Sequence, residues 1–120
     1  AEAEVREKDQ QLIRQLQAMR SEISAVQERI SSIDAEIEDH NLCTEVLKDY
    51  DPSRVCHRAI GGILMEQRVG TTLPAVEKEV VMLSKARSEL AKKMKDAEEE
   101  MKAFQVKHRI RIVSGDLPGA

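Results

Sequence analysis

Apolar residues in the first 47 positions recur at alternating steps of three and four. Written as heptads, one core position holds Leu16, Ile23, Ile30, Ile37 and Thr44, and the other holds Val5, Leu12, Met19, Val26, Ile33, His40 and Leu47. This spacing places them on one stripe of a helix, as in a coiled coil. It predicts a helix over residues 5–49, roughly 65 to 70 Å long at the usual rise per residue. Pro52 forbids its continuation and moves Asp51 out of the α region.

A second helical pattern follows "TTLPAVEKE" and predicts a helix over residues 72–109. A Thr can cap the free N–H groups there, and Pro74 is tolerated in a first turn. One heptad position holds Val76, Leu83, Leu90, Ala97 and Phe104, and the other holds Val80, Arg87, Met94, Met101 and His108. Arg87, Ala97 and His108 dilute this seam, so we expect the helix to depend on the first one. A chain that doubles back makes the pairing antiparallel, and the tail 114–120 should fray.

Between the two patterns, residues 54–69 predict a β-hairpin. Gly61 and Gly62 accept the positive φ angles of a two-residue type I′ or II′ turn, and apolar residues flank them. The register pairs Ile60 with Ile63, Ala59 with Leu64, Arg58 with Met65, His57 with Glu66 and Cys56 with Gln67. Apolar residues then lie on both faces: Cys56, Ile60, Ile63, Met65 and Val69 on one, and Val55, Ala59 and Leu64 on the other. An isolated two-stranded hairpin is marginal in water and has open edges, so this one needs hairpins from other chains, up to a closed barrel.

Composition narrows the class of protein. The chain has 120 residues with one Phe, one Tyr and no Trp, which is little material for a globular core. Its net charge of −3 argues against a nucleic-acid partner. The charge is uneven, with six Lys/Arg against eleven Asp/Glu in residues 1–48 and ten against eight in 75–120, which suits two helices lying side by side. The uncharged runs are too short to cross a membrane, the glutamate-rich start lacks the apolar core of a signal peptide, and two cysteines form no disulfide framework. We therefore expect a soluble, cytoplasmic protein.

The order helix, single hairpin, helix resembles the β-type subunits of prefoldin, a co-chaperone that delivers unfolded chains to a chaperonin. The resemblance is carried by "EDHNLCTEVLKDYDPSRVCHRAIGGILMEQRVGTTLPAVEKE", residues 38–79, and by "FQVKHRIRIV", residues 104–113. It implies a mainly α fold: a long antiparallel two-helix coiled coil with one β-hairpin between the helices, in a single prefoldin-like domain over residues 1–120.

The resemblance also implies partners and a mode of action. Two α-type and three further β-type subunits would complete a hexamer through residues 54–69. The coiled-coil tips would hold non-native proteins such as actin and tubulin, without ATP, and pass them to the cytosolic chaperonin; no cofactor, nucleic acid or membrane is implied. Client contact is expected at apolar residues near the two ends of the chain: Val5, Leu12, Ile13, Leu16, Met101, Phe104, Ile110 and Ile112.

Other interpretations of the same residues are weaker. Met101 and Phe104 also occupy seam positions, so they can simply pack against the first helix. His40, Cys43, Cys56 and His57 invite a zinc site, but their spacing lacks the tight repeated pairs of structural zinc ligands. Cys56 and His57 point to opposite faces of a strand, which disfavours catalysis. The Gly-Gly turn lacks the spacing of a phosphate loop. "KHRIRI" fits cations at a helix C-terminus better than an anion site.

The main alternative function is a coiled-coil scaffold that binds a folded partner.

Overall fold

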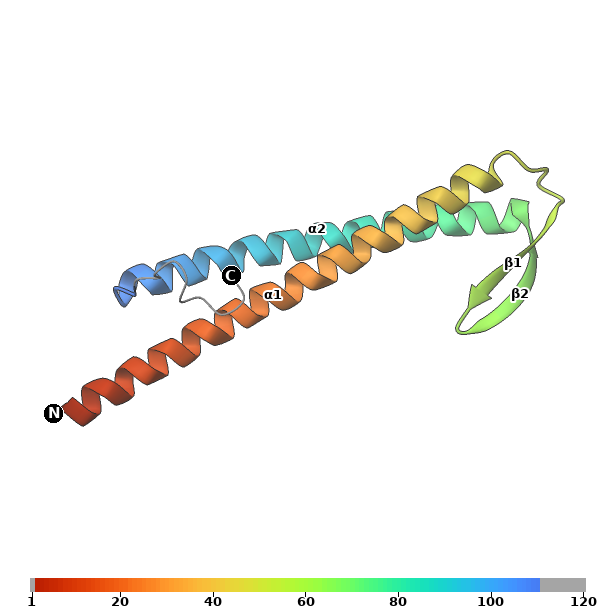
Figure 1. The fold of residues 1–120 in the computed structure, drawn as a ribbon. Helices are drawn as coiled ribbons and strands as arrows, with labels where there is room; N and C mark the ends of the chain where they lie inside the picture. The colour runs from red at the N-terminus through yellow and green to blue at the C-terminus, as the bar shows by residue number, and fades with distance from the viewer. Residues whose placement is uncertain (1, 111–120) are drawn as a thin grey trace. The chain divides into compact units, whose positions relative to one another are not determined.

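The computed structural model describes residues 2–110 and contains two long helices joined by a β-hairpin (Figure 1). Helix α1 spans Glu2–Leu47, strands β1 and β2 span Val55–Ile60 and Ile63–Arg68, and helix α2 spans Val69–Lys107. The chain divides into two compact units: residues 1–28 with 91–120, and residues 29–90. The expected fold, two long helices with one antiparallel hairpin between them, is confirmed.

The heptad stripe of α1 is the side of the helix that is covered. Leu16 and Val26 are buried in the first unit, and Ile30 and Ile33 are buried in the second. The polar members His40 and Thr44 are half-buried. Val5 departs from the pattern because its side chain is exposed. The apolar stripe therefore forms the core along α1 from Leu12 onward.

In the unit of residues 29–90, the two helices run antiparallel. The Arg87 guanidinium donates to both carboxylate oxygens of Asp34, through Nε to Oδ1 and through Nη2 to Oδ2 at 3.2 Å. One and a half turns further along α1, His40 contacts Glu79 of α2. The partner of Asp34 is Arg87 and the partner of His40 is Glu79, so moving forward along α1 means moving backward along α2. Arg87, which dilutes the apolar seam in the sequence, therefore contributes to helix pairing, because its planar guanidinium forms a bidentate pair of hydrogen bonds with the Asp34 carboxylate.

Helix α1 ends in a tight turn before Pro52. The amide of Tyr50 donates to the Leu47 carbonyl at 3.1 Å. The backbone N–H and the hydroxyl of Ser53 both donate to Asp51 Oδ1, at 2.8 and 2.7 Å. These two hydrogen bonds hold the pKa of the Asp51 carboxyl below its usual range. The expected stop at "KDYDPS" is confirmed, with α1 ending at Leu47.

Helix α2 begins at Val69, three residues earlier than the sequence predicts, and Pro74 lies inside it. The expected Thr cap is wrong. Instead, the N–H groups of Val69 and Gly70 donate to the carbonyls of Arg54 and Pro52, both at 2.9 Å. Because the preceding loop satisfies these first donors, the strand passes directly into the helix without a side-chain cap.

The C-terminal end of α2 closes with two backbone hydrogen bonds around Arg109. Arg109 has a positive φ of 54°. Its N–H donates to the Val106 carbonyl at 3.3 Å, and the N–H of Ile110 donates to the Gln105 carbonyl at 2.9 Å. This pair of bonds is a Schellman motif, in which the position held by Arg109 normally favours glycine. The tail 114–120, where fraying is expected, lies outside the described residues.

Candidate functional site: the hairpin and the helix ends

The hairpin has the predicted turn and the predicted register. Gly61 and Gly62 have φ angles of 58° and 81°. Positive values at both positions define the type I′ turn, which matches the twist of the flanking strands. The observed Cα partners are Val55 with Arg68, Cys56 with Gln67, His57 with Glu66, Arg58 with Met65, Ala59 with Leu64 and Ile60 with Ile63. All five expected pairs are therefore present.

Both faces of the hairpin expose apolar side chains near the turn. Ile63 and Leu64 are 67% and 68% exposed and lie on opposite faces, and Ile60 and Met65 are also exposed. Within residues 2–110, this sheet contains only the strands β1 and β2, so each strand has one unpaired edge. Exposed apolar residues beside open edges are a template for pairing with another strand.

The end of the hairpin near the helices is held by polar contacts to the first turns of α2. The Cys56 thiol donates to Thr72 Oγ1 at 3.3 Å, and the Thr72 hydroxyl donates to Gln67 Oε1 at 2.8 Å. Thr72 is buried, with Val69 and Val76 buried on either side of it. Thr72 therefore joins both strands to the helix.

Gly70 allows the loop before β1 to approach α2 closely. A Cβ added at Gly70 would lie 3.2 Å from Pro52 Cβ and 3.3 Å from the Pro52 carbonyl oxygen. That carbonyl is also the acceptor of the Gly70 N–H. A side chain at this position would fit only if the Pro52 loop moved by a few tenths of an ångström, so the close approach of the loop, and not φ, favours glycine here.

Glu79 connects three elements through one carboxylate oxygen. Its Oε2 accepts from Arg58 Nη2 of β1 at 2.8 Å and lies 3.0 Å from His40 Nε2 of α1. The other imidazole nitrogen lies 2.6 Å from the Glu36 carbonyl. The hydrogen bond from His40, followed by the charge of Arg58, lowers the pKa of the Glu79 carboxyl despite partial burial. This cluster of His40, Arg58 and Glu79 ties the hairpin to both helices.

The expected client-binding residues near the chain ends lie in different environments. Val5 and Ile13 are exposed, and Leu16 is buried. Leu12, Met101, Phe104 and Ile110 are half-buried, and Ile112 lies outside the described residues. The Phe104 ring lies 4.5 Å from the His108 ring, between centroids. Ile110 is the residue that completes the Schellman motif of α2.

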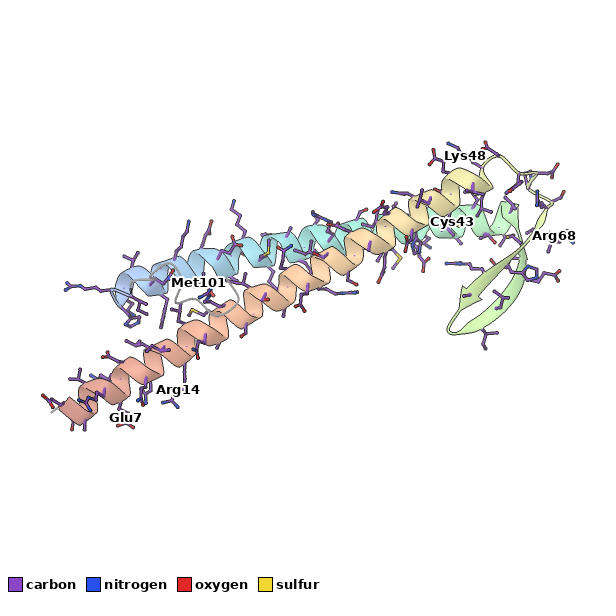
Figure 2. All side chains as sticks on the ribbon, viewed as in Figure 1. Glu7, Arg14, Cys43, Lys48, Arg68 and Met101 are labelled. Carbon is purple, nitrogen blue, oxygen red and sulfur yellow. The ribbon has the colours of Figure 1, made fainter. Side chains whose placement is uncertain are left out.

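An open groove of about 490 Å³ lies between α1 and α2 within the first unit. Met101 lies on the side of α2 that faces α1 (Figure 2) and lines this groove with Ile23 and Met94. Arg20, Glu28, Glu98 and Lys102 are among the polar residues around it. Flexible methionine side chains can adapt to apolar groups of different shapes.

The zinc hypothesis gains no support from the positions of its residues. His40 and Cys43 line one cleft of about 420 Å³, together with Asp39, Arg58 and Glu79. Cys56 lies elsewhere, bonded to Thr72. Among residues 2–110, no three His, Cys, Asp or Glu side chains are grouped so that they could hold a metal ion. Across the same residues, neither helix has a stretch long and apolar enough to span a membrane.

The geometry defines a class of protein in which one open-edged hairpin is carried between two long helices. Comparison with known proteins identifies the family within this class. The family model described as "Prefoldin subunit" matches residues 10–115, and the chain therefore belongs to the prefoldin subunit family.

Individual relatives agree with this assignment. The chain is 29% identical over 107 residues to prefoldin subunit 2 of Homo sapiens, a match that covers 89% of this chain and 70% of the relative. It is 28% identical over 111 residues to probable prefoldin subunit 2 of Schizosaccharomyces pombe, covering 92% and 97%. The crystal structure of the prefoldin beta subunit from Thermococcus strain KS-1 has the same fold, with a TM-score of 0.70 at 13% identity, covering 87% of this chain and 93% of that one.

Proposed function

We propose that this chain is a subunit of a cytosolic prefoldin co-chaperone and that it acts by binding, without catalysis and without ATP. The observation that carries the proposal is the hairpin, whose exposed Ile63 and Leu64 lie beside two unpaired strand edges. A water-exposed hairpin of this kind is stabilised when other strands cover its edges. Family membership supplies the partners: other prefoldin subunits.

In this proposal, residues 1–120 work as one prefoldin-like domain, and the hairpins of two α-type and four β-type subunits pair edge to edge until barrels close. The hairpin residues expected at the interface then become more buried: Val55, Cys56, Ala59, Ile60, Gly61, Gly62, Ile63, Leu64 and Met65. Val69 was also expected there, but it is already buried as the first residue of α2 and is left out of this interface. The cluster of His40, Arg58 and Glu79 supports the proposal, because it fixes the direction in which the hairpin leaves the helices.

Client capture is proposed for the ends of the helices. Val5 and Ile13 are exposed there, and Met101 lines an open groove. Weak contacts of this kind from several subunits add up through effective concentration, and each one releases readily. Unfolded actin and tubulin would be held in this way and passed to the cytosolic chaperonin. Leu16 is buried, the Phe104 ring contacts the His108 ring, and the Ile110 backbone N–H closes the end of α2. We therefore assign these three residues a supporting role in the helices.

Assembly through the hairpin is tested by Ile63→Lys. A charged side chain at this position would be buried without a partner when hairpins pair, whereas the free chain leaves it in water. We expect the variant to keep its far-UV helicity and to be lost from the complex with the other subunits in size-exclusion chromatography. Val81→Lys is the matched control, because Val81 is equally exposed but lies on α2. Retention of the Ile63→Lys chain in the complex would refute the hairpin as the assembly element.

A further inference from the structure

The outer side of α1 near its C-terminal end carries apolar side chains that neither the hairpin nor the helix seam uses. Leu42 and Val46 are both 56% exposed, and Tyr50 is 39% exposed. They are spaced four residues apart, so they follow one row along the helix surface. The turn that ends α1 continues the winding, since the N–H groups of Asp49 and Tyr50 donate to the carbonyls of Val46 and Leu47. We call Leu42, Val46 and Tyr50 the outer ridge.

The outer ridge is surrounded by carboxylates. Glu38 lies one turn before Leu42 in the same row, Asp39 lies in the row on one side, and Glu45 and Asp49 lie in the row on the other. Between positions 36 and 51 the sequence has six Asp/Glu and a single Lys/Arg, Lys48. Lys48 points away from α2 (Figure 2). Arg54 is engaged with Tyr50, its guanidinium carbon 3.9 Å from the ring centroid.

We propose that the outer ridge is a docking surface for a basic amphipathic helix of another protein. A row of residues at four-residue spacing fits between the side-chain rows of a second helix. The four carboxylates around the row favour a partner with Lys or Arg beside its apolar stripe, and they repel a second copy of the same acidic surface. The proposal is separate from client capture at the helix ends and from assembly through the hairpin.

Tyr50 makes the proposal directly measurable, because it is the only Tyr in a chain without Trp. The probe is a leucine–lysine peptide of about 18 residues whose leucines form one helix face. Titrated into the chain of residues 1–120 at low salt, the peptide should change the Tyr50 fluorescence in a saturable way. High salt should weaken the binding, because exposed charges are screened. The same peptide with Glu in place of Lys should not bind.

Variants locate the site of binding. The double variant Leu42→Ser, Val46→Ser should lower the affinity for the peptide about tenfold, as expected for the apolar centre of an interface. The double variant Glu38→Lys, Glu45→Lys should also lower the affinity for the peptide and should make the binding less dependent on salt. Val81→Ser with Met82→Ser is the matched control, since these two side chains are exposed on α2, and it should leave the affinity unchanged.

Four results would overturn the proposal. The peptide could leave Tyr50 unaffected, the α2 control could lose as much affinity as the ridge variant, or the acidic peptide could bind as tightly as the basic one. A fourth contrary result is that Tyr50 fluorescence depends on the concentration of the chain alone and that Leu42→Ser with Val46→Ser removes this dependence. The occupant would then be a second copy of the chain.

Discussion

At the scale of single residues, glycine at positions 61 and 62 is required by backbone geometry. Both residues have positive φ angles, and an added Cβ would meet no atom within 4 Å at either one. The cost of a side chain there comes from the backbone conformation alone, because residues with a Cβ rarely adopt it.

Gly62→Val tests this requirement. A β-branched residue at a φ of 81° is strained, so the type I′ turn should be lost and the strands should shift their register. We expect the subunit to be lost from the complex in size-exclusion chromatography, while circular dichroism still shows the two helices. Normal incorporation of the Gly62→Val chain would mean that the turn geometry does not control assembly.

Arg109 shows the opposite situation, a non-glycine residue where glycine is favoured. Its φ is 54°, at the position of the Schellman motif that glycine commonly occupies. Arg109→Gly should relieve strain and increase the free energy of unfolding by about 1 kcal/mol or somewhat less. Urea unfolding followed by circular dichroism measures this change. Lys107→Gly is the control and should destabilise the chain, because Lys107 is the last residue within α2.

At the scale of elements, the cluster of His40, Arg58 and Glu79 links α1, β1 and α2, and it is sensitive to acid. The pKa of Glu79 is lower in the folded chain than in the unfolded chain. Its stabilising effect is therefore complete above the unfolded pKa, about 4, and is lost as the pH falls through the lower folded value.

Glu79→Gln should remove this part of the pH dependence. At neutral pH we expect a loss of about 0.5 to 1 kcal/mol, as for other partly exposed ion pairs. The thermal midpoint of the variant should drop less between pH 7 and pH 3 than that of the parent chain. Part of the drop should remain, because Arg87 also lowers the pKa of Asp34 and that carboxylate is still protonated in acid. Glu77→Gln is the control and should keep the full drop. An unchanged drop in the Glu79→Gln variant would contradict the role of the cluster.

The elements that depend on local patterns were predictable from the sequence. The heptads of α1 and the register around Gly61 and Gly62 follow from residue spacing, and the structure reproduces both. The start of α2 was not predictable, because the carbonyls of Pro52 and Arg54 cap it from across a loop. The cluster around Glu79 was missed for a similar reason. Its members are 21 and 39 positions apart along the chain, and only the folded arrangement brings them together.

At the scale of the whole molecule, the two kinds of apolar surface have separate roles in our proposal. The exposed residues around the hairpin turn specify assembly, and the exposed or half-buried residues near the helix ends contact unfolded clients. Leu16, Val26, Ile30 and Ile33 on the α1 seam are buried and serve the packing of the helices themselves. Substitutions near the helix ends should therefore leave assembly intact, whereas a substitution in the hairpin should impair client holding only by removing the subunit from the complex.

The central claim is that the assembled complex holds unfolded proteins. It is tested most directly by light scattering of chemically denatured actin diluted into buffer with the complex of this chain and its partner subunits. We predict a delay in aggregation that is lost when the chain carries Ile63→Lys and retained when it carries Val81→Lys. If the intact complex binds a native protein tightly but does not delay actin aggregation, the chain is a scaffold and the chaperone account is contradicted.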